Sequence, residues 1–147
     1  MGQNDDHLLH NACTTEHLKL LKYIFGNPDF NIDFNIVNQF GQTPLHFASF
    51  YGRLEAIKFL LLNAKEKGIL LDIIDTGGCT PFYLACHAGN FEIVKFYFDN
   101  CIELGLNILN DWREAKDAAR ENGHQDIVKL FTSWTYFKLK VAFLSWK

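Results

Sequence analysis

The chain contains an internal repeat. When the 147-residue sequence is shifted by 37 positions, residues 40–61 (FGQTPLHFASFYGRLEAIKFLL) fall on residues 77–98 (GGCTPFYLACHAGNFEIVKFYF). A further shift of 34 gives another copy around Gly123, and a shift of 36 in the other direction gives a fainter copy that includes Leu9 and His10. In chain order the faint copy is the first of four and the copy around Gly123 is the fourth. A period of this length is typical of repeat architectures, in which each copy is one supersecondary unit that must stack on its neighbours to bury its apolar face.

Each copy predicts two short antiparallel helices. In the second copy, Thr43 precedes Pro44, which places a capping oxygen before a proline at the first helical position. Gly52 follows two turns later, where a helix ends in a left-handed residue. The next segment has apolar residues at three- and four-residue steps, the spacing of a half-buried helix. We therefore predict an all-α fold.

The run Thr43-Pro44-Leu45-His46-Phe47-Ala48 followed by Gly52 resembles the ankyrin repeat. In the third copy Tyr83 stands in place of the histidine, and the fourth copy has lost the Thr-Pro-Leu-His element. The resemblance implies an ankyrin-repeat solenoid of stacked helix-turn-helix units with short connecting fingers, the divergent outer repeats serving as caps. The expected organisation is a single domain over 1–147, with repeats at about 5–37, 38–74, 75–109 and 110–135 and an aromatic C-terminal tail at 136–147.

The repeats are longer than the 33 residues of the family pattern. The unit lengths are 36, 37 and 34, and the extra residues fall around 27–33, 65–71 and 100–106. Because these insertions follow the second helix, we expect either that helix to be lengthened or the next loop to be widened.

Composition excludes several function classes. The chain is 48% hydrophobic and 21% charged with a net charge of −3, so it has enough apolar surface to fold. A near-neutral balance argues against nucleic acid and against a polybasic membrane anchor as partners. The sequence has no apolar run of 18 residues and begins with a polar segment. These features favour a cytoplasmic location, which can extend to the nucleus.

No pattern in the sequence indicates catalysis, a metal or a cofactor. The four cysteines, Cys13, Cys79, Cys86 and Cys101, are scattered and form neither a Cys-x-x-Cys pair nor a dense disulfide framework. His10 has the spacing of a metal ligand with His7, but it also occupies the position that His46 fills in the next repeat, which favours a structural role. No phosphate-binding loop or nucleophile motif is present. We predict a protein that is not an enzyme.

The resemblance also implies where a partner binds. Proteins of this family bind partner proteins on the concave face built from finger tips and first helices. Clustered exposed aromatic residues are favoured anchors in such interfaces, although wide side chains can instead fill space between a finger and a helix. The positions carried over as partner-binding are Phe40, Gln42, Phe50, Tyr51, Thr76, Cys79, His87, Trp112, Arg113 and Glu121.

The 15% aromatic content is divided between the repeats and the tail. Phe47, Phe59, Phe82, Phe91, Phe96 and Phe98 occupy repeat positions that pack between helices. The tail has three interpretations: a capping helix over the last repeat, a docking segment for another subunit or a second copy, or a membrane-surface segment. Its candidate contact residues are Trp134, Tyr136, Phe137, Phe143 and Trp146.

Taken together, the sequence predicts a protein–protein interaction module that acts as a scaffold or adaptor. One alternative is a small stand-alone regulatory or inhibitory subunit, because the chain is little more than its repeats. A second alternative is an assembly protein that associates with itself through the aromatic tail.

Overall fold

The computed structural model describes residues 3–15 and 18–134. All regular secondary structure in these residues is helical, which confirms the predicted all-α class. No helix among the described residues is both long enough and apolar enough to cross a membrane. The helices are α1 (Gln3–Thr14), α2 (Leu18–Gly26), α3 (Pro44–Phe50), α4 (Leu54–Leu62), α5 (Ala64–Lys67), α6 (Pro81–Ala88), α7 (Phe91–Leu104) and α8 (Trp112–Glu121), followed by a helical segment at 125–134.

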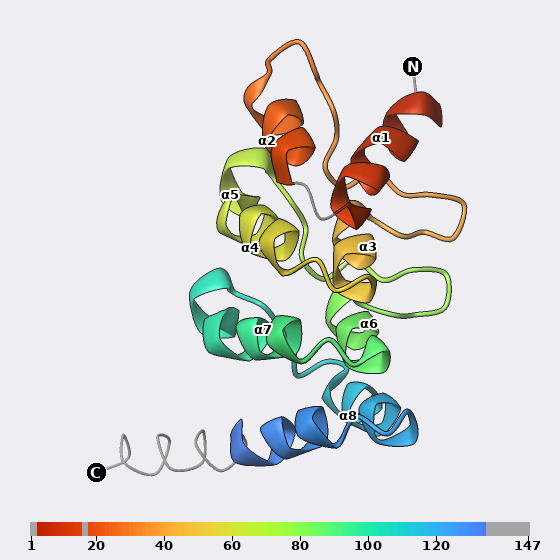
Figure 1. The fold of residues 1–147 in the computed structure, drawn as a ribbon, viewed down its shortest axis with the longest axis vertical. Helices are drawn as coiled ribbons and strands as arrows, with labels where there is room; N and C mark the ends of the chain where they lie inside the picture. Colours follow the sequence, from red (N-terminus) through yellow and green to blue (C-terminus); the bar gives the residue numbers. More distant parts are fainter. Residues whose placement is uncertain (1–2, 16–17, 135–147) are drawn as a thin grey trace.

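The helices form two stacked layers (Figure 1). The inner layer contains α1, α3, α6 and α8, each in contact with the next, and the outer layer contains α2, α4, α7 and the segment at 125–134. Two loops, the fingers at 38–42 and 75–79, project beside the inner layer. Each short helix thus buries its apolar stripe against the neighbouring repeats as well as against its own partner helix.

The predicted caps are confirmed. Thr43 and His46 form a reciprocal capping box at the start of α3, and the Thr80 hydroxyl accepts a hydrogen bond from the Tyr83 N–H at 3.0 Å at the start of α6. Gly89 ends α6 with φ at +80°, a left-handed conformation that favours glycine. The helix boundaries in the two central repeats therefore follow directly from the Thr-Pro pairs and the glycines.

A hydrogen bond joins each repeat to the one before it at the same place. The residue that follows the helix-terminating glycine donates from its side chain to a carbonyl at the end of the preceding inner helix. His124 has this linking role in the last repeat. The bonds are Arg53 Nε to the Thr14 carbonyl (2.6 Å), Asn90 Nδ2 to the Phe50 carbonyl (2.9 Å) and His124 Nε2 to the His87 carbonyl (3.1 Å).

The three insertions have three different structures. After α2 the chain makes a turn in which the Phe30 N–H donates to the Asn27 carbonyl at 3.1 Å. After α4 a separate short helix, α5, is added. In the third repeat α7 itself is extended to 14 residues. Both expected outcomes, a lengthened helix and a widened loop, are therefore present in the same chain.

Much of the aromatic surplus is in the core, as predicted. Phe82 and Phe98 are buried, and Phe59, Phe91 and Phe96 are partly buried against the core. Phe47, also predicted there, is partly buried, with its ring centroid 4.8 Å from that of His10. Ser49 and Tyr97 add a polar pair to this interior, with 3.2 Å between their hydroxyl oxygens. Pairing these hydroxyls matters because an unsatisfied buried polar group is costly.

Candidate partner-binding face

Both fingers are built on the same hydrogen-bonding device. One side-chain oxygen at the start of each finger accepts two backbone N–H groups, which closes the loop. The Thr76 N–H also donates to the Phe40 carbonyl at 2.9 Å and ties the second finger to the first. We call the surface formed by the two fingers and the inner helices the finger face. The bonds are Asn38 Oδ1 with the N–H of Phe40 (2.9 Å) and Gln42 (3.0 Å), and Asp75 Oδ1 with the N–H of Gly77 (2.9 Å) and Cys79 (2.9 Å).

Two buried histidines hold the fingers against the inner helices. His10 Nε2 donates to the Gln42 carbonyl at 2.8 Å, and His46 Nε2 donates to the Cys79 carbonyl at 3.0 Å. His46 Nδ1 in turn accepts from the Thr43 N–H at 3.0 Å and lies 2.8 Å from its hydroxyl. Burial lowers the pKa of His46. Both rings are structural, as the repeat alignment predicted for His10.

The third repeat replaces the histidine by a carboxylate from the next repeat. Tyr83 occupies the histidine position, and the Thr80 hydroxyl donates to Asp111 Oδ2 instead of pairing with an imidazole. Burial is the main cause that raises the pKa of Asp111, and the Asp72 and Glu114 charges add to it. This substitute for the missing histidine was not predicted, because Asp111 lies outside the family's Thr-Pro-Leu-His element.

Three of the predicted partner-binding aromatics are exposed on the finger face. Phe40 is 54% exposed, Phe50 43% and Tyr51 51%. The Phe50 and Tyr51 rings meet edge to face with centroids 5.2 Å apart. Beside them lies a depression of about 160 Å³, which we call the aromatic hollow. It is lined by Gln42, His46, Phe47, Phe50, Tyr51 and Leu84.

The polar candidates extend along the same layer. Gln42 and Cys79 are half-buried at the bases of the fingers, and Thr76 is exposed at the second finger. His87 is exposed at the end of α6, where its ring stacks on that of Tyr83 with centroids 6.1 Å apart. Arg113 and Glu121 are exposed on α8. The candidate positions therefore run from the first finger to the last inner helix.

Trp112 lies in a different environment. It is half-buried, and its ring is 4.6 Å from that of Phe131 and 5.0 Å from that of Trp134, centroid to centroid. Phe98 completes this cluster between the last two repeats, so the structure does not bring Trp112 together with the aromatic hollow. Of the tail residues, Trp134 is in this cluster, whereas Tyr136, Phe137, Phe143 and Trp146 lie outside the described residues.

Three cysteine thiols among the described residues have raised pKa values. Burial raises the pKa of the Cys13 thiol to about 12 and that of Cys86 well above its usual value. Burial, followed by the Asp75 charge, also raises the pKa of Cys79, so these thiols are protonated at neutral pH. No disulfide joins any of the four cysteines, and residues 3–15 and 18–134 contain no group of three histidine, cysteine or acidic side chains able to hold a metal ion.

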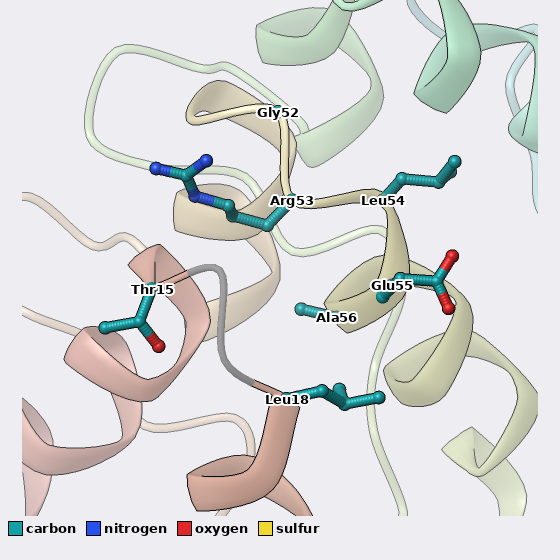
Figure 2. Close-up of a pocket in the computed structure, with 7 residues that line it drawn as sticks. All are labelled: Thr15, Leu18, Gly52, Arg53, Leu54, Glu55 and Ala56. Atoms are coloured by element: carbon teal, nitrogen blue, oxygen red, sulfur yellow. The ribbon is translucent and has the colours of Figure 1, made fainter.

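A second depression, of about 330 Å³, lies where the turn between α3 and α4 passes the end of α1 and the start of α2 (Figure 2). The Arg53 side chain extends over the end of α1, and Glu55 points the other way (Figure 2). The residues that line this second depression are Thr15, Leu18, Gly52, Arg53, Leu54, Glu55 and Ala56.

Sequence reasoning missed part of the aromatic hollow. The repeat alignment predicts that Phe47 packs between helices and gives no role to Leu84, whereas both residues line the hollow. A signal was available, because the shift of 37 places both residues at one repeat position on adjacent inner helices. This alignment places both side chains between α3 and α6, where they line the aromatic hollow.

Two family models match the chain. Residues 9–61 match the model described as ankyrin repeats in many copies, and residues 77–106 match the model of the ankyrin repeat. A comparison with curated proteins gives no match. The matched residues include most of the helix pairs of the first three repeats and the first finger, whereas α8 and the segment at 125–134 lie outside both matches. This chain is a member of the ankyrin-repeat family.

Proposed function

We propose that the protein is an interaction module, a scaffold or adaptor, that binds a partner protein through the finger face. Ankyrin repeats generally mediate protein–protein interaction. The observation that supports this face most directly is the pair of exposed rings, Phe50 and Tyr51, at the rim of the aromatic hollow. Aromatic side chains beside a pocket are the residues that most often dominate binding energy.

The position of these rings on rigid elements strengthens the proposal. Phe50 is the last residue of α3, and its carbonyl is fixed by the bond from Asn90. Neighbouring finger backbones are hydrogen-bonded to each other and to the two histidines. A binding surface that is already ordered loses less conformational entropy when a partner docks.

The test is affinity capture from native lysate with the variant F50A/Y51A. The matched control is Y23A/L62A, which truncates two outer-layer side chains that are 61% and 66% exposed. We expect the yield of captured protein to fall about tenfold or more for F50A/Y51A, while the control keeps the wild-type yield. Both variants are checked for unchanged helical circular dichroism. Equal capture by all three proteins would contradict the proposal.

A stand-alone regulatory or inhibitory subunit is a narrower form of the same function, in which the captured partner is an enzyme whose rate falls on binding. A rate assay on the captured partner separates it from a scaffold. We further propose a cytoplasmic location, extending to the nucleus. Four cysteines without a disulfide support this location, because the cytosol keeps cysteines reduced. Cell fractionation of the tagged chain tests this location.

A further inference from the structure

We propose that the aromatic hollow and the second finger bind residues 135–147 of a second copy of this chain. The inference deepens the proposed function, because it names an occupant for the same face. The finger face carries little formal charge. Residues 38–51 and 75–89, which supply both fingers together with α3 and α6, contain one formally charged side chain, Asp75. No lysine or arginine lies in either stretch.

The surroundings of the second finger are acidic. The pKa of Cys79, in this finger, is raised by burial first and then by the charges of Asp75 and Asp111. Burial raises the pKa of Asp111, and the charges of Asp72 and Glu114 raise it further. The basic residues nearest to Asp111 in the sequence are Arg113 and Lys116, both on α8. The apolar hollow is therefore flanked on one side by a surplus of negative charge, and His46 connects the two regions because it lines the hollow and bonds to the Cys79 carbonyl.

A hollow of this size takes one large apolar side chain. Its volume is about 160 Å³, and a cavity of roughly 150 Å³ lined by apolar side chains holds a benzene ring. The Phe50 and Tyr51 rings extend the apolar surface beyond the hollow itself. The complementary ligand is thus a polypeptide segment with a phenylalanine- or leucine-sized side chain next to a lysine or arginine.

Residues 135–147, with the sequence TYFKLKVAFLSWK, have this composition. The segment holds three of the 14 lysines and arginines and none of the 17 acidic residues, so the rest of the chain has a net charge of −6. Phe137, Lys138, Leu139 and Lys140 alternate large apolar and basic side chains. Opposite charge and matching apolar character make this segment complementary to the finger face.

A second copy is the more direct source of the segment. The described chain ends at residue 134, in the outer layer of the last repeat (Figure 1). The residues that line the hollow belong instead to the first finger, α3 with the residue after it, and α6. In the inner layer, α8 lies between α6 and the end of the stack. Reciprocal exchange between two copies makes the same contact twice and closes into a two-fold dimer.

The experiment is a charge swap in the full chain, read by sedimentation velocity over a wide concentration range. The finger variant is D75N/T76K. The D75N change retains a side-chain oxygen for the two backbone bonds of the finger, since Asn38 makes the same bonds in the first finger, and Thr76 is exposed. The segment variant is K138E/K140E. The matched control, K19E/K22E, makes the same charge change at exposed positions of α2.

We expect the wild-type protein and the control to dimerise with the same affinity, and each swap variant alone to dimerise about tenfold or more weakly. An equimolar mixture of the two swap variants should recover dimerisation, because both contacts in the mixed dimer again pair opposite charges. A wild-type protein that stays monomeric at every concentration, as docking within one chain would give, overturns the inference. A mixture that stays as weak as its components overturns it too.

The two proposals fail in distinguishable ways. If the wild-type protein is monomeric while F50A/Y51A loses a captured protein, the second-copy inference is wrong and the partner-binding function stands. If mixing the two charge-swap variants restores dimerisation while affinity capture yields only this chain, the function is self-assembly through this face.

Discussion

The imidazole of His124 lies against the backbone of Gly89, so that a Cβ added at Gly89 would be 2.4 Å from His124 Cε1. Gly89 also has φ at +80°. Its lack of a side chain therefore serves two purposes: it ends α6, and it allows the next repeat to dock closely enough for the His124 bond to the His87 carbonyl.

Replacing Gly89 by Ala should destabilise the fold through both causes. The left-handed backbone costs roughly 1–2 kcal/mol and the overpacking against His124 roughly 1–3 kcal/mol more. The matched control is G123A, because Gly123 has the same φ but nothing within 4 Å of an added Cβ. Urea unfolding should show the larger loss for G89A. Equal losses for the two variants would mean that the ring moves aside without cost.

Asp111 gives the junction between the third and fourth repeats a dependence on pH. Burial raises its pKa above 3.8, so the folded state binds the proton more tightly than the unfolded state. Its contribution to stability is present at low pH and is lost as pH rises through the folded pKa. D111N keeps an acceptor for the Thr80 hydroxyl and removes the charge. We expect D111N to be more stable than wild type near neutral pH.

That difference should shrink as the pH is lowered toward 3.8, because wild-type Asp111 then becomes neutral. Thermal unfolding of both proteins across this range measures it, with E103Q, an exposed carboxylate on α7, as the control. A D111N variant that is less stable than wild type near neutral pH would show that the Thr80 hydroxyl needs the charged acceptor.

His46 should titrate below its usual range. Burial lowers its pKa from 6.5, and its Nδ1 accepts from the Thr43 N–H, so protonation loses an acceptor. Stability from this group is present above 6.5 and falls as pH drops toward the folded pKa. Nitrogen-detected NMR of the imidazole should show the Nε2–H tautomer near neutral pH and a titration midpoint below 6.5. A midpoint at or above that value would contradict the buried, neutral ring.

The Ser49–Tyr97 pair should behave as a coupled unit. Both side chains are buried, and their oxygens are 3.2 Å apart. Y97F leaves the Ser49 hydroxyl without this partner, which costs about 1–3 kcal/mol. S49A/Y97F should cost less than the sum of the single variants, and a double-mutant cycle in urea should give a coupling of about 1 kcal/mol. Strict additivity would mean that each hydroxyl finds another partner.

The sequence predicted the fold where local chemistry decides it. Thr43 and Thr80 with their prolines, and Gly52 and Gly89, fix helix starts and ends through short-range capping. The insertions were located but not their form, because the choice between a turn, a separate helix and a longer helix depends on packing against the neighbouring repeat.

The candidate site was predicted less completely. Phe40, Phe50 and Tyr51 were found because the repeat register places them outside the core. Trp112 falls on the finger position of Gly41 and Gly78 in the same alignment but packs on Phe131. The aromatic residues of the last helix supply a cluster that a position-by-position comparison does not contain. Asp111 was missed for a related reason, because its role appears only when Tyr83 is seen to leave the Thr80 hydroxyl without an imidazole.

The bonds from Arg53, Asn90 and His124 reach equivalent carbonyls with a guanidinium, an amide and an imidazole. The position therefore constrains length and hydrogen-bond donation but not residue identity. Mutation can exchange one donor for another there without unstacking the repeats. A comparison that scores residue identity sees only divergence at this position, whereas the stacking geometry that the three side chains maintain is the same at every junction.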